Sequence, residues 1–250
     1  MYSAVFLTVR TGSTRLPKKA LIEVSPNVTA VEFLLERLQG VSESNFTVLC
    51  TTTLPEDDIL CRIAENHGVR FFRGSVEDKM ERWLGAASEN QVEVFVTADG
   101  DDLLCDPTLV DEALRVMNSS DLDFLEAPDV PCGAFTYALR TAALETACRV
   151  KKTTDTEMMW VYFKETGLFR TGVLAKIDED LRRPEFRMTL DYPEDLDFFR
   201  NVIGHFGGRT DPSLREIIAY LDKNPEVSAI NSFRQVDFLA NQAQRTHLEV

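Results

Sequence analysis

Positive charge and histidine are both scarce in this 250-residue sequence. It has 27 Lys and Arg against 41 Asp and Glu, a formal net charge of −14, and only 3 His. A general nucleic-acid binder needs a basic surface that displaces counterions from phosphates, so this balance argues against that class. It also disfavours adsorption to anionic membranes. His67, His205 and His247 are scattered, and we expect them to be surface or structural residues.

Long apolar runs and paired cysteines are also absent. No stretch of the sequence approaches the ~20 apolar residues that a membrane-spanning helix needs. The apolar stretch at residues 4–9 has no basic residue before it, so we expect a first strand and not a signal peptide. The 5 Cys are odd in number and form no CxxC pair, which argues against a zinc site or a disulfide framework. We therefore expect a cytoplasmic protein with reduced cysteines.

Short apolar segments alternate with amphipathic ones, which predicts an α/β fold with a mainly parallel sheet. We expect one domain over residues 1–230, with residues 128–186 as an elaboration over the sheet and 231–250 as a peripheral polar tail. The expected strands are 4–9, 46–50, 69–72, 92–97 and 123–127. The expected helices are 29–38, 56–66, 76–88, 107–117, 139–150, 155–166, 193–205 and 213–221.

A basic loop follows the first strand. The first twenty residues contain Arg10, Arg15, Lys18 and Lys19 and no acidic residue. Ligands of open α/β sheets bind beyond the carboxyl ends of the strands, which is where this loop lies. Gly12 allows a close approach of the backbone to a phosphate, and the cations neutralise its charge. Neither GxGxxG nor GxxxxGK[ST] is present, so we predict a phosphate loop of another kind.

Carboxylates follow two later strands. Asp99-Gly100-Asp101-Asp102 ends the fourth strand, and Asp191 precedes the helix that Pro193 opens. Glu194 and Asp195 favour the dipole of that helix whatever the function, and Asp106 is expected to cap the helix at Pro107. One carboxylate at each of two strand ends, facing a phosphate loop, predicts a magnesium–nucleotide site, because Mg²⁺ takes one or two carboxylates plus phosphate oxygens.

Three segments in the correct order resemble the cytidylyltransferase family, which includes the enzymes that activate sialic acid and 3-deoxy-manno-octulosonate. The resemblance covers most of residues 1–230 and is closest to the SpsF-type spore-coat-polysaccharide branch. Asp99 also matches the aspartate of the family's central turn. The segments are Arg10 to Leu21, Phe72-Arg73-Gly74-Ser75 with Glu77-Asp78, and Thr189-Leu190-Asp191-Tyr192-Pro193-Glu194-Asp195-Leu196.

The resemblance implies a single Rossmann-like, glycosyltransferase-A-type nucleotidyltransferase domain that forms a homodimer. It would transfer CMP from CTP to an acidic, 2-keto-3-deoxy or sialic-acid-like sugar, releasing pyrophosphate, for surface polysaccharide biosynthesis. Mg²⁺ would be held by Asp99 and Asp191, which with Arg15 and Lys19 form the implied catalytic set. The implied nucleotide-binding residues are Arg10, Gly12, Ser13, Arg15, Lys19, Thr51, Thr52, Thr53, Arg73, Gly74 and Ser75. Gly133 and Glu157 are implied at the acceptor.

The sequence departs from the family pattern at several positions. Lys18 stands where the family commonly has Gly and offers a further phosphate contact. Residues 131–133 and 156–158 differ where the acceptor binds, so the sugar itself can differ. Three alternatives stay open at this point. They are a glycosyltransferase that uses Asp99-Gly100-Asp101 as a DxD motif, a guanylyl- or uridylyltransferase acting on a sugar phosphate, and a non-catalytic nucleotide-binding regulatory subunit.

Overall fold

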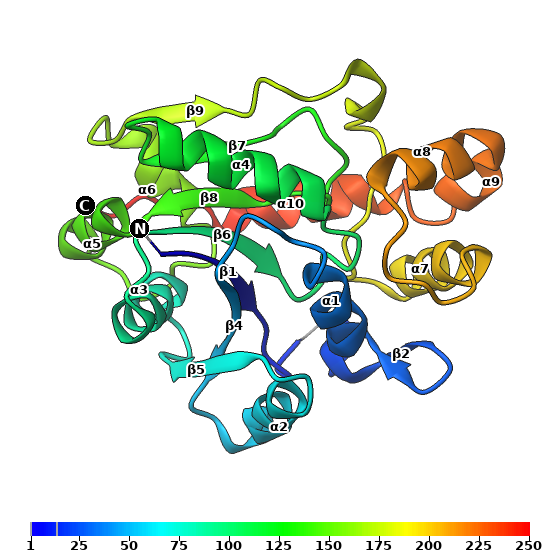
Figure 1. Ribbon diagram of the computed structural model, residues 1–250, viewed down its shortest axis with the longest axis horizontal. Coiled ribbons are helices and arrows are strands. Elements are labelled where there is room, and N and C mark those ends of the chain that lie inside the picture. Colours follow the sequence, from blue (N-terminus) through cyan, green and yellow to red (C-terminus); the bar gives the residue numbers. More distant parts are fainter. Residues whose placement is uncertain (1, 14) are drawn as a thin grey trace.

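A seven-stranded sheet organises the computed structural model, which describes residues 2–13 and 15–250 (Figure 1). Thr14, within the predicted phosphate loop, lies outside the described residues. The strand order is β5-β4-β1-β6-β8-β7-β9, and β8 runs antiparallel to both its neighbours while the other pairs are parallel. The predicted α/β fold with a mainly parallel sheet is confirmed. The chain reverses its direction of travel across the sheet at β1, which is where open α/β sheets form their ligand crevice.

The strands and helices have the following bounds. The strands are β1 Ser3–Thr8, β2 Glu23–Ser25, β3 Val28–Thr29, β4 Phe46–Thr52, β5 Arg70–Gly74, β6 Val94–Asp99, β7 Phe124–Glu126, β8 Tyr137–Arg140 and β9 Thr171–Val173. The α-helices are α1 Ala30–Leu38, α2 Asp58–Asn66, α3 Lys79–Asn90, α4 Pro107–Ser119, α5 Thr141–Val150, α6 Trp160–Glu165, α7 Pro193–His205, α8 Leu214–Lys223, α9 Pro225–Ser228 and α10 Arg234–Arg245. Three short 3₁₀ helices are η1 Lys19–Leu21, η2 Pro55–Asp57 and η3 Glu179–Leu181.

Helices cover both faces of the sheet, and alternate residues of β1 point to opposite sides. Val5 and Leu7 join one apolar core with α1, α4, α7 and α8. Ala4 and Phe6 join a second core with α3, α5 and α6, where the Phe6 ring stacks on Phe95 with centroids 4.4 Å apart. Burial on both faces explains why the predicted strands are apolar without polar alternation.

The predicted helix starts hold where capping residues mark them. Asp106 caps α4 by accepting hydrogen bonds from the backbone N–H of Thr108 and Leu109 at 3.0 and 3.1 Å, with Pro107 in the first turn. The predicted helix 139–150 is wrong at its beginning, because it is strand β8 as far as Arg140. The predicted helix 155–166 is reduced to α6.

Residues 128–186 do more than lie over the sheet. They supply β8, which pairs with β6 and β7, and β9, which extends the sheet beyond β7. Neither strand was expected from the sequence. Both are only three or four residues long, and their conformation depends on the neighbouring strands more than on local preference.

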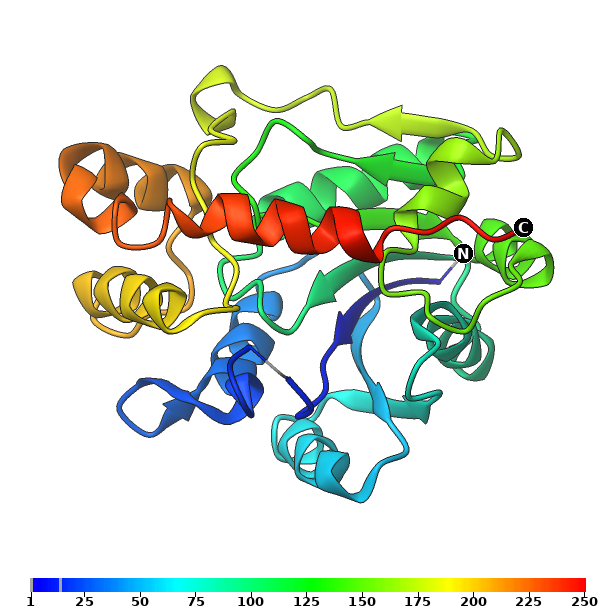
Figure 2. The ribbon, with the colours of Figure 1, turned by 180° about the vertical axis from the view of Figure 1, so that it is seen from behind.

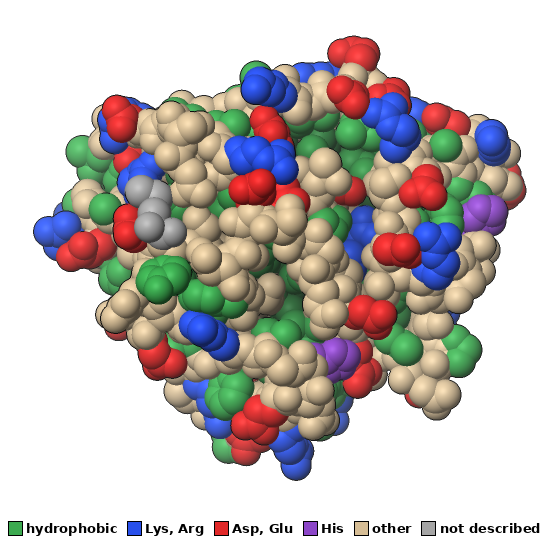
Figure 3. All heavy atoms as spheres, in the orientation of Figure 1, with side chains coloured by type: hydrophobic (Ala, Val, Ile, Leu, Met, Phe, Trp, Pro, Cys, Tyr) green, Lys and Arg blue, Asp and Glu red, His purple; other side chains and the backbone are tan. Residues whose placement is uncertain are grey.

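The C-terminal segment is not the peripheral tail that we expected. Helix α10 crosses in front of the sheet when the molecule is seen from behind (Figure 2), and its residues line the two cavities described below. On the opposite side, Lys and Arg side chains are interspersed among Asp and Glu side chains (Figure 3). Across the described part of the chain, every helix is too short or too polar to span a membrane.

Candidate active site

The site lies where the neighbouring parallel strands β1 and β6 end side by side. In the pairing of β1 with β6, Thr8 lies opposite Asp99, so the basic loop after β1 and the acidic turn after β6 leave the sheet together. The backbone N–H of Gly100 donates to the Thr8 carbonyl at 2.8 Å. A Cβ on Gly100 would lie 2.7 Å from the side chain of Val9, so only glycine allows the turn and the loop to pack this closely.

A buried carboxylate holds the start of the basic loop. Asp57 in η2 accepts hydrogen bonds from the Thr11 backbone N–H at 2.8 Å and from the Thr11 hydroxyl at 2.7 Å. The Thr52 hydroxyl also donates to it. Burial alone would raise the pKa of Asp57, but the hydrogen bonds from Thr52 and Thr11 outweigh burial and lower the pKa. The loop is therefore fixed by an ionised side chain beneath it.

The first cavity lies over this loop and has a volume of about 430 Å³. Arg10, Gly12, Ser13, Arg15 and Lys19 all line it, as the sequence predicts. A Cβ on Gly12 would meet no atom of the described residues within 4 Å, so the backbone there is open to the cavity. Several cations and exposed backbone beside an open space are the features that bind a polyphosphate.

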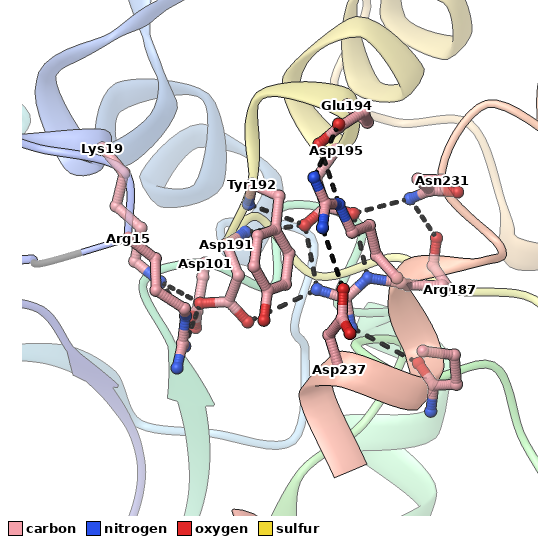
Figure 4. A network of polar contacts seen from close by, with 12 residues as sticks. Arg15, Lys19, Asp101, Arg187, Asp191, Tyr192, Glu194, Asp195, Asn231 and Asp237 are labelled. Carbon is pink, nitrogen blue, oxygen red and sulfur yellow. Dashed lines mark hydrogen bonds and ion pairs between the residues drawn. The ribbon is translucent and has the colours of Figure 1, made fainter. Parts of the chain in front are cut away.

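Two carboxylates, Asp101 and Asp191, interleave with Arg15 and Lys19 (Figure 4). The Lys19 ammonium donates to Asp101 at 2.5 Å and to Asp191 at 2.8 Å. Asp191 also accepts a hydrogen bond from the Arg15 guanidinium at 2.5 Å. In the same way, Lys79 at the start of α3 donates to Asp99 at 2.7 Å.

The ion pairs fix the charge states of this group. Burial alone would raise the pKa of Asp191, but Lys19 and Arg15 overcome burial and lower it to about 2. For Lys19, burial favours the neutral amine, yet Asp101 and Asp191 raise its pKa. Lys79 behaves in the same way, because Asp99 raises its pKa against burial. The cations stay charged in an enclosed site, which is what neutralising a phosphate requires.

A second set of contacts, made by Arg187 and Asp195, fixes the position of Asp191. Arg187 donates to both oxygens of Asp195 at 2.9 Å and to Asp191 at 3.4 Å (Figure 4). Asp195 also accepts the backbone N–H groups of Asp191 and Tyr192 at 2.9 Å each and the amide of Asn231 at 2.9 Å. The structural role expected of Asp195 is thus observed, and its hydrogen bonds fix the chain that carries Asp191. The strand expected before Asp191 is not formed, since the chain there has only an isolated bridge between Arg187 and Cys132.

Three carboxylates of the central turn are close enough to share a cation. Single oxygens of Asp99, Asp101 and Asp102 lie within 4.8 Å of one another. Burial and mutual repulsion raise the pKa of Asp101 despite Lys19, and they raise the pKa of Asp102 further. An all-oxygen group whose negative charges crowd one another fits a hard divalent cation such as Mg²⁺. Asp191, the other predicted ligand, lies across the Lys19 ammonium from Asp101.

A second, larger cavity adjoins the first and has a volume of about 630 Å³. Residues 126–137, α6 and α10 line it, and both predicted acceptor residues, Gly133 and Glu157, are among its lining. Gly133 has φ +90°, and a Cβ there would lie 2.1 Å from the Met188 carbonyl. Glycine is therefore required where this wall meets the chain leading to Asp191.

Six of the predicted nucleotide-binding residues line neither cavity. They are residues 51–53 and 73–75. Thr51 and Thr52 are fully buried. Arg73 donates to the carbonyls of Thr52 and Leu54 and pairs with Asp58, and the carbonyl of Gly74 accepts the N–H of Thr53. The Ser75 carbonyl accepts from Arg82, which does line the first cavity. Arg73 and Ser75 therefore support neighbouring backbone and Arg82, and the nucleotide contact expected of residues 51–53 and 73–75 stays a prediction.

Sequence reasoning missed five residues that line or support the site. They are Asp57, Lys79, Arg82, Asn241 and Arg245. One signal was present for Lys79, because a lysine in the first turn of a helix opposes the helix dipole and needs a partner. The Arg15 guanidinium donates to Asn241 at 2.8 Å, so α10 contacts the basic loop directly. The Arg15 Nε atom is buried and has no hydrogen-bond partner within the described residues, which leaves a donor for a ligand.

Comparison with known proteins decides the family. A model of the cytidylyltransferase family matches residues 4–236. The chain belongs to the cytidylyltransferase family. This confirms the family that the sequence motifs indicate, and the protein is therefore a nucleotidyltransferase.

Two curated proteins are similar to nearly the whole chain. An uncharacterized protein of Methanocaldococcus jannaschii is 29% identical over 246 residues, which are 98% of this chain and 97% of that protein. The spore coat polysaccharide biosynthesis protein SpsF of Bacillus subtilis is 27% identical over 229 residues, 89% of this chain and 95% of that protein.

Solved structures agree in fold. A cytidylyltransferase from Leptospira borgpetersenii superposes with a TM-score of 0.82 at 26% identity, covering 91% of this chain and 96% of that one. A CMP:2-keto-3-deoxy-manno-octonic acid synthetase in complex with CTP superposes with a TM-score of 0.63 at 14% identity, over 82% of this chain and 100% of that one. The second likeness shows the shared fold.

Proposed function

We propose that this cytidylyltransferase transfers CMP from CTP to the hydroxyl of an acidic sugar of the 2-keto-3-deoxy, sialic-acid-like class, with release of pyrophosphate, in surface polysaccharide biosynthesis. Family membership over residues 4–236 supports CMP transfer. Two relatives support the acceptor class, since one is named for spore coat polysaccharide biosynthesis and another is a CMP:2-keto-3-deoxy-manno-octonic acid synthetase.

One observation carries the proposal. Two cavities of about 430 and 630 Å³ share a wall that contains Arg15, Lys79, Asp99, Asp101 and Glu157. The first cavity holds the basic loop and suits a triphosphate, and the second suits an acceptor. Nucleotidyl transfer needs two such spaces, because the acceptor oxygen must reach the α-phosphorus in line with the departing pyrophosphate.

The residues of the chain perform the steps as follows. The acceptor hydroxyl oxygen forms a bond to the α-phosphorus, the bond from that phosphorus to the bridging oxygen breaks, and the hydroxyl proton passes to solvent. Arg15 and Lys19 neutralise the charge that builds up on the phosphate oxygens, and Asp191 keeps both cations oriented. Gly12 presents open backbone to the phosphates.

We propose Mg²⁺ as the cofactor, held by Asp99 and Asp191 with Asp101 as a further ligand. The oxygen-only donor set and the crowded charges of the central turn support this choice. When bound, Mg²⁺ would supply electrostatic stabilisation of the reacting phosphates. Lys19 contacts both Asp101 and Asp191, so it would share these carboxylates with the metal.

Thermal unfolding with each of CTP, UTP, GTP and ATP, with and without Mg²⁺, tests the donor. A ligand at ~100 times its Kd adds about 2.7 kcal/mol, which raises the midpoint by roughly 5–10 °C for a chain of this length. We expect a metal-dependent rise with CTP alone. A rise in the midpoint with GTP or UTP instead would mean that the donor nucleotide carries a different base. A rise only with nucleotide-sugars would favour a glycosyltransferase.

Pyrophosphate release across a panel of 2-keto-3-deoxy sugar acids then tests the acceptor. We expect CTP-dependent release with at least one acid and none with the corresponding neutral hexoses. If CTP binds with Mg²⁺ but no acid supports release, the acceptor class is wrong. A non-catalytic nucleotide-binding subunit would then be the better description.

A further inference from the structure

The chemistry of the proposed acceptor places its carboxylate close to the reacting phosphorus. In the ring form of a 2-keto-3-deoxy acid, the attacking hydroxyl is on the carbon that also bears the carboxylate. When that hydroxyl approaches the α-phosphorus, the carboxylate must lie at the wall shared by the two cavities. This inference rests on the proposed function. An anion next to a triphosphate needs its own cation, and the shared wall has to provide it.

Most of the cations that line the cavities already have firm protein partners. Arg15 donates to Asp191 at 2.5 Å and Lys79 to Asp99 at 2.7 Å. The other firmly bonded ones are Lys19 with Asp101 and Asp191, Lys164 with Glu126, and Arg82 with backbone carbonyls. Arg10 is held more weakly, by the Val76 carbonyl at 3.4 Å and by Glu157 at 3.5 Å.

Arg245 differs from all of these cations. It lines both cavities, but within the described residues its guanidinium makes no hydrogen bond, and its one ion pair is to Asp155 at 4.0 Å. Its side chain is 38% exposed. An arginine with uncommitted donors can take a carboxylate in the planar, two-bond geometry that it prefers.

Helix α10 aims Arg245 at the shared wall. Gln235, Phe238, Asn241 and Arg245 recur at helical spacing and all line the second cavity. Three contacts dock this face of the helix. The Arg187 guanidinium lies over the Phe238 ring at 4.7 Å, Arg187 donates to Gln235 at 3.3 Å, and Arg15 donates to Asn241 at 2.8 Å.

We propose that Arg245 binds the carboxylate of the sugar acid and so determines the selectivity for acidic acceptors. Glu157 on the same wall does not repel the carboxylate strongly, because Arg10 pairs with it at 3.5 Å. Arg245 is then the cation that remains for the substrate. Its role is binding, and no proton or bond of the reaction passes through it.

A cycle that changes both the enzyme and the substrate tests this role. Turnover is measured for the best sugar acid and for its primary amide, with the wild-type protein and with Arg245→Gln. We expect the wild type to prefer the acid by about 10–100-fold in kcat/KM, as a charge-assisted contact commonly provides. Arg245→Gln should lose most of this preference while the KM for CTP stays unchanged. Arg245→Lys, which keeps the charge, should restore part of it.

Arg149→Gln is the matched control. Arg149 is on α5, outside both cavities, is 68% exposed and has a similarly loose ion pair, with Glu145 at 3.9 Å. It should keep the full preference for the acid. If Arg245→Gln also keeps that preference, or if its loss falls on the KM for CTP, the role of Arg245 is wrong while the proposed function stands. If the wild type uses no acid at all, the proposed acceptor class fails first and takes this inference with it.

Discussion

The basic loop of residues 10–21 and helix α10 reach the site from opposite ends of the chain and are built in opposite ways. In the loop, Thr11 is held by Asp57, and Lys19 is held by two carboxylates. Helix α10 has no buried residue, and Val236 on it is 72% exposed. The cations of the loop are therefore held by carboxylates, which suits the proposed triphosphate. The helix is docked by contacts along one face and buries none of its residues, which suits the proposed role of Arg245 at the acceptor.

The largest expected effect comes from removing the ion pairs that hold the cations of the basic loop. Asp191→Asn removes the charge that orients Lys19 and Arg15, so we expect turnover to fall by at least ~10²-fold with the fold intact. Pyrophosphate release measures the rate, and far-UV circular dichroism checks the fold. Asp197→Asn, at an exposed position of helix α7 just after Asp191, is the control and should keep its activity. An unchanged rate in Asp191→Asn would remove this residue from the catalytic set.

The basic loop and the carboxylates that face it were also easier to predict from the sequence than helix α10. Arg10, Arg15 and Lys19 stand out because four basic residues without an acid are unusual in a chain with net charge −14. Asp99 stands out because it ends strand β6, and Asp191 because it lies just before the helix that Pro193 opens. The sheet was predictable for a similar reason, since β1, β4 and β6 are largely apolar and amphipathic helices lie between the strands.

Helix α10 and strands β8 and β9 left no comparable signal in the sequence. Helix α10 is mostly polar, so its sequence resembles that of a solvated tail, and only tertiary contacts such as Arg15 with Asn241 show where it lies. Strands β8 and β9 were missed because their neighbours in the sheet impose their conformation. Arg73 and Ser75 were assigned to the nucleotide because their motif is distinctive. In the structure these residues hold Arg82 and the chain after β4, and their contact with a nucleotide stays a prediction.

A smaller effect should follow from loosening the anchor beneath the loop. Asp57→Asn should cost about 1.5–3 kcal/mol of unfolding free energy at pH 7, because the hydrogen bonds from Thr11 and Thr52 lose their charged acceptor. The folded state lowers the pKa of Asp57. Its contribution is therefore complete above the unfolded pKa of about 3.9 and is lost progressively as the pH falls from that value through the lower folded pKa.

Urea unfolding of the wild type and Asp57→Asn between pH 7 and pH 3 measures this difference. The gap between the two proteins should be widest at pH 7 and should narrow towards pH 3. Glu56→Gln, at the exposed neighbouring position, should show no such gap. A gap that stays constant with pH would mean that the charge of Asp57 does not hold the loop.

The smallest expected effect distinguishes two adjacent lysines of the loop. Lys18 has φ +54°, a left-handed conformation that favours glycine. It is exposed and lines neither cavity, whereas Lys19 is committed to two carboxylates. We expect the free energy of unfolding of Lys18→Gly to be about 0.5–1 kcal/mol higher than that of Lys18→Ala, because alanine keeps the strained Cβ. Both variants should retain wild-type turnover. Urea unfolding and initial rates measure the two effects. A rate loss shared by both variants would show that Lys18 contacts the triphosphate, so that the phosphate-binding part of the site extends to every cation of the loop.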